Sequence, residues 1–186
     1  IFNTWLIVDV LQPMRALYLR MPAVATLVLV IGAGYIIGGI RSALVVGGLT
    51  LFIALSPWWD RALVTLYMAT FGVFISCIIG FTVGILSFQN KHTANFMLGV
   101  CDIFQTFPSF VYLIPVMMLF GVTDTSVLIA VVVYATIPAT RYTIEGLRSV
   151  PDALHDAATM SGVTKLQRLL KIEFPLAFPH MMLGIN

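Results

Sequence analysis

Charge is the scarcest property of this chain, because Asp, Glu, Lys and Arg make up 10% of its 186 residues while hydrophobic residues make up 60%. Soluble domains typically carry about 25% charged residues, and a core of this size could not hide so much apolar surface from water. The sequence therefore excludes an ordinary soluble domain and predicts a protein that lies in the lipid bilayer. The net charge of +2 comes from dispersed basic residues, and no basic stripe interleaved with aromatic residues suggests nucleic-acid binding.

Sequence patterns for catalysis and metal binding are also missing. No Gly-x4-Gly-Lys-Ser/Thr phosphate loop occurs in the sequence, so we expect the chain not to bind ATP itself. His92, His155 and His180 lie far apart and lack the spacing of metal ligands. Cys77 and Cys101 both have apolar neighbours, which favours two small buried hydrophobic side chains. We therefore predict no catalytic residue, no metal site and no cofactor bound by this chain.

The apolar residues occur in runs that are hydrophobic on every face, such as residues 23–31 and 127–133. In lipid the backbone must satisfy its own hydrogen bonds, which leaves helices or a closed barrel. A barrel strand would alternate apolar and polar residues, and these runs do not alternate. The sequence therefore predicts an all-α fold, a polytopic transmembrane helical bundle.

The division of the chain into segments follows from the length that a span requires, which is about 20 apolar residues. Residues 1–21 mix apolar and charged residues, so we expect an interfacial or peripheral N-terminal helix there, followed by a transmembrane domain at residues 22–186. Since the chain starts at Ile1 and stops at Asn186 inside an apolar segment, we expect a fragment that is truncated at its C-terminus and lacks part of its N-terminus. About five to six spans are expected, at residues 22–40, 43–56 (after a turn at Arg41 and Ser42), 63–88, 96–122 and 127–143, with the last beginning near Phe174.

Glycine pairs at four-residue spacing predict where helices pack closely. Gly34-x3-Gly38 and Gly80-x3-Gly84 each give a helix a face without side chains. We expect these faces to pack inside the chain rather than in a dimer.

Prolines interrupt the expected fourth span, because Pro108 and Pro115 each remove a backbone donor. Broken helices at membrane depth are tolerated where they line a cavity or are buried in protein. Polar side chains beside the break could therefore bind a zwitterion in a translocation path, or could satisfy the carbonyl groups that the prolines free. The sequence leaves both alternatives open. The residues assigned to this path are Gln105, Thr106, Pro108, Ser109, Tyr112 and Pro115.

Aromatic and charged residues lie near the same break. Aromatic faces attract quaternary ammonium groups, although aromatic residues serve equally well as lipid-facing bulk. The aromatic residues concerned are Phe104, Phe107, Phe110, Tyr112 and Phe120. A charge inside the membrane usually has a partner, so Asp102 and Arg141 are expected to pair if their spans pack, whereas Asp102 could equally lie at the cytoplasmic surface.

The longest polar segment, residues 145–175, follows the expected fifth span. Its basic residues place it in the cytoplasm by the positive-inside rule. Two short helices are expected within it, with Ser149 as the first N-cap, Gly162 as a left-handed C-cap and Thr164 as the second N-cap. Such a helix–glycine–helix segment could dock in a groove of a partner, or could lie on the bilayer as an amphipathic loop.

A family resemblance rests on this polar segment. Asp156-Ala157-Ala158, then Gly162, then Ile172, Phe174 and Pro175 resemble the EAA signature E-A-A-x3-G-x9-I-x-L-P of bacterial ABC-importer permeases, with Asp for Glu and Phe for Leu. Residues 102–121, 138–146 and 175–186 look like the permeases of glycine betaine, proline betaine, choline and carnitine importers. The resemblance covers roughly residues 63–186.

The resemblance implies a type I ABC-importer permease in the inner (plasma) membrane, a multi-pass protein and not an enzyme, that imports a compatible solute for osmoprotection. The implied solute is glycine betaine or a related quaternary amine. The implied partners are a second permease copy, an extracytoplasmic substrate-binding protein and a separate ABC ATPase that holds ATP and Mg. In this family the segment carries the coupling helix. The residues to which the ATPase-coupling role is transferred are Asp152, His155, Asp156, Ala157, Ala158, Ser161, Gly162, Lys165 and Arg168.

One alternative from another class stays open, a secondary transporter or channel for small zwitterions that works without an ATPase. Such a protein would not need the EAA spacing, and it would more often bury several acidic residues for ion coupling.

Overall fold

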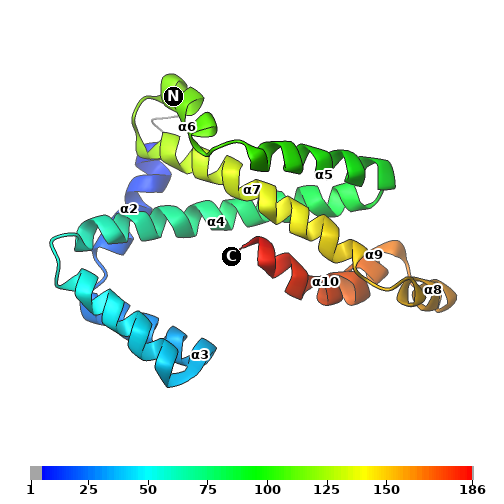
Figure 1. The fold of residues 1–186 in the computed structure, drawn as a ribbon, viewed down its shortest axis with the longest axis horizontal. Coiled ribbons are helices and arrows are strands. Elements are labelled where there is room, and N and C mark those ends of the chain that lie inside the picture. Colours follow the sequence, from blue (N-terminus) through cyan, green and yellow to red (C-terminus); the bar gives the residue numbers. More distant parts are fainter. Residues whose placement is uncertain (1–5, 186) are drawn as a thin grey trace. The chain divides into compact units, whose positions relative to one another are not determined.

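The computed structural model describes residues 6–185, apart from the side chains of Leu6 and His155, and all regular elements in that range are helices (Figure 1). The all-α fold expected from the composition is therefore confirmed. The chain divides into two compact units, Ile1–Thr70 and Phe71–Asn186. Helix α4 (Trp59–Phe88) ends the first unit and begins the second.

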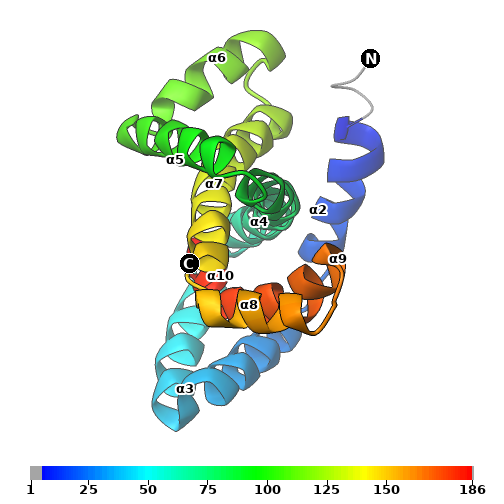
Figure 2. The ribbon, with the colours of Figure 1, turned by 90° about the vertical axis from the view of Figure 1, so that its right-hand side faces the viewer.

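The first unit contains a helical hairpin. The described elements of this unit are a short π-helix, η1 (Leu6–Leu11), α2 (Gln12–Leu19) and α3 (Ala23–Ala54), before it reaches α4. Helix α3 is broken at Gly38 and Gly39, and its two arms fold back on each other (Figure 2).

The break in α3 lies just before the turn expected at Arg41 and Ser42. Gly39 has a φ of 67°, a conformation that glycine adopts without steric cost, whereas Arg41 and Ser42 simply continue the second arm. A Cβ atom on Gly34 would lie 3.2 Å from the Cα of Ala43, so the arms approach closely at this glycine. The expected packing of Gly34 inside the chain is confirmed.

The second unit is arranged around one long helix, α7 (Asp124–Arg148), which packs against α5, α6 and α10 (Figure 1). The other elements of this unit are α5 (Lys91–Thr106), α6 (Phe110–Phe120), α8 (Asp152–Met160), α9 (Lys165–Arg168), η2 (Leu169–Glu173), α10 (Phe174–Met181) and η3 (Met182–Gly184).

Helix α4 contacts α7 through a row of small residues at four-residue spacing, Gly72, Ser76, Gly80 and Gly84. The hydroxyl of Ser76 donates to the carbonyl oxygen of Val132 on α7 over 3.3 Å. Cβ atoms added at Gly80 and Gly84 would lie 2.5 Å from the Cβ atoms of α7 side chains. The two backbones therefore approach more closely than any larger residue would allow, which confirms the packing expected of the second glycine pair.

Three of the described helices, α4, α7 and α3 counted across its break, are long and apolar enough to cross a membrane. The pair α5 and α6, bent by 85°, adds a fourth crossing if it is one broken span. The expected five to six spans are matched only roughly, because residues 22–56 form one hairpin of short arms and α10 is short. The expected break at Pro108 is confirmed, whereas Pro115 lies inside α6, where the loss of one hydrogen bond does not stop the helix.

We expect Gly84→Leu to destabilise the second unit, because the added side chain would push against Thr143 and against the Thr140 carbonyl oxygen, which is 3.1 Å from the Cβ position. Overpacking of this kind costs about 1–3 kcal/mol. Thermal unfolding of the purified transporter in detergent measures the effect. Gly99→Leu is the matched control, because a Cβ atom there meets nothing within 4 Å. Equal melting temperatures for the two variants would contradict the close α4–α7 contact.

Candidate functional site

The segment between α7 and α10 begins with a sharp change of direction. Helix α7 runs to Arg148, and Ser149 is its C-cap, with its hydroxyl donating to the carbonyl oxygen of Gly146 over 2.7 Å. The expectation that Ser149 is the N-cap of the next helix is therefore wrong, because its side chain is already bonded to α7. Helix α8 starts after Pro151, whose ψ of 137° is extended, and Asp152 lies in its first turn.

A left-handed glycine ends α8, as the sequence predicted. Gly162 has a φ of 68°, and its amide donates to the carbonyl oxygen of Thr159 over 3.1 Å. The next amide, that of Val163, donates to the carbonyl oxygen of Ala158 over 3.4 Å. This pair of bonds is the Schellman arrangement. A Cβ atom on Gly162 would meet nothing within 4 Å, so only the backbone conformation demands glycine here.

Helix α9 follows at once, because Thr164 caps it. The Thr164 hydroxyl accepts from the amide of Gln167 over 3.3 Å, and the Gln167 side chain accepts from the amide of Thr164 over 2.9 Å. This reciprocal capping box confirms the expected second helix start. The chain then passes through η2 directly into α10. We call residues 152–173 the elbow (Figure 2).

One face of α8 is exposed in the described part of the chain. Asp152, Asp156 and Met160 recur at four-residue spacing and are all exposed, Met160 to 89%. Ala158 faces the other way and is only 4% exposed. The elbow thus presents two carboxylates and one flexible apolar side chain along a single row.

The remaining residues to which the coupling role was transferred lie around this row. Ala157 and Ser161 are exposed, and the Ser161 hydroxyl donates to the Ala157 carbonyl oxygen over 2.8 Å. Lys165 is exposed on α9. The side chain of His155 lies outside the described residues.

An ion pair fixes the inner side of the elbow. The Nε atom of Arg168 lies 2.8 Å from Oε1 of Glu173, and Glu173 is only 2% exposed. Arg168 is one of the residues to which the coupling role was transferred, whereas Glu173, its partner in this ion pair, is not. The available clue was a glutamate inside the EAA-like pattern, five residues after an arginine.

The elbow is attached to the rest of the second unit through an apolar cluster. Leu147 and Val150, at the end of α7, are buried against Ala177 and Met181 of α10. Next to them, the guanidinium of Arg148 donates to the Asn95 side-chain oxygen over 2.7 Å and ties the end of α7 to the start of α5. The end of α7 is therefore held by α5 and α10 together.

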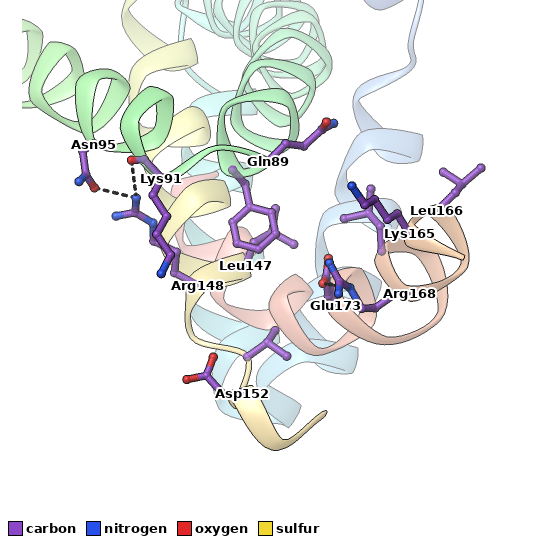
Figure 3. Close-up of a pocket in the computed structure, with 13 residues that line it drawn as sticks. Gln89, Lys91, Asn95, Leu147, Arg148, Asp152, Lys165, Leu166, Arg168 and Glu173 are labelled. Carbon is purple, nitrogen blue, oxygen red and sulfur yellow. Dashed lines mark hydrogen bonds and ion pairs between the residues drawn. The ribbon is translucent and has the colours of Figure 1, made fainter. Parts of the chain in front are cut away.

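A cavity of about 860 Å³ separates the elbow from the turn between α4 and α5 (Figure 3). Lys91, Asn95 and Arg148 lie on one side of it, and Lys165 and Arg168 lie on the other. The elbow therefore packs against α7 and α10, and a cavity lies between it and α5.

Two turns before the end of α7, Arg141 bonds to three polar side chains. Its guanidinium donates to Asp102 and, over 3.2 Å, to Gln105 on α5. Its Nε atom donates to Glu145, one turn along α7, over 3.0 Å. The expected Asp102–Arg141 pair is confirmed. Gln105, which the sequence assigned to a translocation path, is bonded to this arginine.

The other residues assigned to the path lie at the break between α5 and α6. The Tyr112 hydroxyl donates to the Phe104 carbonyl oxygen, the group that Pro108 leaves without its helical donor. The Thr106 hydroxyl donates to the Ile103 carbonyl oxygen over 2.6 Å. Both side chains therefore satisfy the backbone at the break.

The two remaining path residues are spread over the bend and α6. Ser109 precedes α6 without capping it through its side chain, and Pro115 lies within that helix, past the bend.

The break also brings three aromatic rings together. The rings of Phe104 and Tyr112 are stacked at a centroid distance of 5.9 Å, and Tyr134 of α7 lies 6.1 Å from Tyr112. The place of Tyr134 beside the break could not be predicted from the sequence, because Tyr134 lies in an apolar span with no local pattern to mark it.

Comparison of the chain with known proteins identifies its family. Residues 72–185 match the family described as binding-protein-dependent transport system inner membrane component. Over its full length the chain is 96% identical to 26% of a trimethylamine N-oxide transport system permease protein of Pelagibacter ubique and 41% identical to 28% of one of Ruegeria pomeroyi. Over 95% of its length it is 30% identical to half of a glycine betaine/proline betaine transport system permease protein of Escherichia coli.

The chain thus spans about a quarter to a half of the length of these relatives. The family match covers the whole second unit described above except its first and last residues. With several apolar helices of spanning length, the chain belongs to the family of binding-protein-dependent transport system inner membrane components and is a multi-pass protein of the inner membrane.

Proposed function

We propose that this chain is part of the translocation subunit of an ATP-driven importer, and that its elbow docks on a separate ATPase in the cytoplasm. The family is one of transport components, which supports a role in moving solute rather than in catalysis. ATP and Mg belong to the partner in this proposal. A second permease copy completes the path, and a binding protein outside the membrane delivers the solute.

One observation carries the coupling role, the exposed elbow that follows α7 after a short turn at residues 149–151. Its row of Asp152, Asp156 and Met160 is exposed, whereas Ala158 on the same helix and Glu173 of the ion pair with Arg168 are buried. A partner groove that matches this row would offer basic groups for the carboxylates and an apolar pocket for Met160. The connection between α7 and the elbow is short, so a partner that moves the elbow also moves α7.

The route from the elbow to the break runs along α7. Its end is fixed by the cluster of Leu147 and Val150, and Arg141 ties its middle part to α5 just before the bend. Rotation or tilt of α7 would therefore change the position of α6 relative to α5. In the proposed cycle this movement opens and closes the path at the break.

The proposed solute is a methylated amine, with trimethylamine N-oxide as the first choice. The sequence suggested glycine betaine or a related quaternary amine. The relatives' names extend this group to trimethylamine N-oxide, which appears in the names of the two relatives that match the whole chain. Trimethylamine N-oxide and glycine betaine share a positively charged nitrogen that bears three methyl groups.

Uptake by the reconstituted transporter tests the proposal. Vesicles that contain the permease, its ATPase and its binding protein should accumulate labelled trimethylamine N-oxide only with ATP on the ATPase side. Glycine betaine is the competing solute, and an unmethylated amine of similar size is the negative control. Equal accumulation without ATP or without the ATPase chain would contradict the proposal and favour a secondary transporter or channel.

Replacement of Gly162 tests the elbow directly. Gly162→Val places a β-branched residue in the left-handed conformation, which costs about 1–2 kcal/mol, so we expect ATP-driven uptake to fall about 5- to 30-fold while the permease still folds. Gly162→Asn should fall less, because asparagine tolerates this backbone conformation.

The matched control for the elbow is Gly99→Val, on a helical glycine whose Cβ would also meet nothing within 4 Å. It should transport like the unchanged protein. Wild-type uptake by Gly162→Val would remove the elbow from the coupling mechanism.

A further inference from the structure

We propose that Phe104, Tyr112 and Tyr134 form a transient binding site for the methylated nitrogen of the solute inside the permease itself. This aromatic trio joins three different helices, α5, α6 and α7, at the break of the bent pair. The inference rests on the proposed function and adds to it the residues that recognise the solute within the membrane.

The geometry of the trio leaves aromatic surface available. Phe104 and Tyr112 are stacked with an interplanar angle of 13°, and Tyr134 is tilted by 54° to Tyr112. Tyr112 therefore contacts two rings of different orientation, Phe104 and Tyr134. Phe104 and Tyr134 remain 38% and 47% exposed, so the ring surfaces are not used up by packing within the chain.

The ring at the centre of the trio is held in place. The Tyr112 hydroxyl donates to the Phe104 carbonyl oxygen, so the group freed by Pro108 anchors the tyrosine of the following helix. Tyr112 lies across the bend from Phe104, and its orientation therefore depends on the angle between α5 and α6. A change of this angle would separate the stacked rings and alter the site.

The position along α7 suits a translocation path. Tyr134 lies about 15 Å from the Asp124 end of α7 and about 21 Å from its Arg148 end, at 1.5 Å of rise per residue. The trio is therefore near the middle of this span. A site at that depth lies between the point of solute delivery and the elbow.

The chemistry of the solute explains why rings and not carboxylates would hold it. A trimethylated nitrogen has no N–H group to donate, and aromatic faces attract such a cation through their quadrupole. The nearby acidic side chains of Asp102 and Glu145 are bonded to Arg141. Aromatic attraction is worth about 2- to 30-fold in affinity, weak enough for the solute to leave again.

Fluorinated phenylalanines test the site without changing its shape. Mono-, di- and trifluorophenylalanine at position 104 remove the ring's negative face stepwise. We expect the KM for trimethylamine N-oxide uptake, measured by varying the concentration of loaded binding protein, to rise in steps to about 2- to 30-fold. The same series at Phe96, an exposed ring at the start of α5, should leave transport unchanged. A role in stacking alone would not weaken with fluorination.

A second pair of variants addresses the α7 wall. Tyr134→Phe keeps the ring and should transport nearly as the unchanged protein does, whereas Tyr134→Leu should lose about as much as the trifluorinated residue. ATP hydrolysis stimulated by the loaded binding protein verifies assembly in each case.

Two outcomes separate the inference from the proposed function. Normal uptake of trimethylamine N-oxide by every fluorinated variant and by Tyr134→Leu would overturn the aromatic site while leaving the importer intact. Absence of uptake of any methylated amine by the unchanged transporter would overturn the proposed function itself.

Discussion

The pairing of the Arg141 guanidinium governs how α5 and α7 meet in the second unit. The guanidinium bonds to Asp102 and Gln105 on α5 and to Glu145 on its own helix. These bonds hold α5 and α7 in one register. The bend between α5 and α6 begins at Pro108, directly after this contact, so α7 is fixed to α5 next to the bend.

The rest of the unit makes α7 suitable for carrying movement. The row of small residues on α4 brings the two backbones into contact, and the apolar cluster at the end of α7 joins it to α10. Beyond this cluster the elbow projects as two short helices joined at Gly162, with a cavity on the side of α5. Movement of the elbow thus has one stiff route into the unit, and that route passes Arg141 and reaches the aromatic trio.

The sequence predicted the features whose cause is local. The left-handed Gly162, the capping Thr164 and the break at Pro108 each follow from the backbone chemistry of one or two residues. For Asp102 the sequence left two alternatives open, a pair with Arg141 or a position at the cytoplasmic surface, and the structure shows the pair. The polar segment was found because charge is scarce elsewhere.

The features that the sequence did not predict depend on contacts between distant residues. Ser149 has the composition of an N-cap, but its hydroxyl is used by the preceding helix. The turn expected at Arg41 was displaced to Gly39, because positive φ outweighs polarity at a helical break. Tyr134 lies near the break only because α7 packs there. The ion pair of Glu173 with Arg168 is likewise a contact that the sequence did not predict.

The central claim is that movement of the elbow reaches the break through α7 and Arg141. The most direct measurement is the distance between spin labels on the elbow and on α6, at Leu166→Cys and Phe110→Cys, in the assembled transporter with Cys77 and Cys101 replaced by alanine. ATP should shift this distance when Arg141 is present and should leave it unchanged in Arg141→Gln, although the ATPase still binds. An equal ATP-dependent shift in both proteins, or no shift in either, would contradict the account.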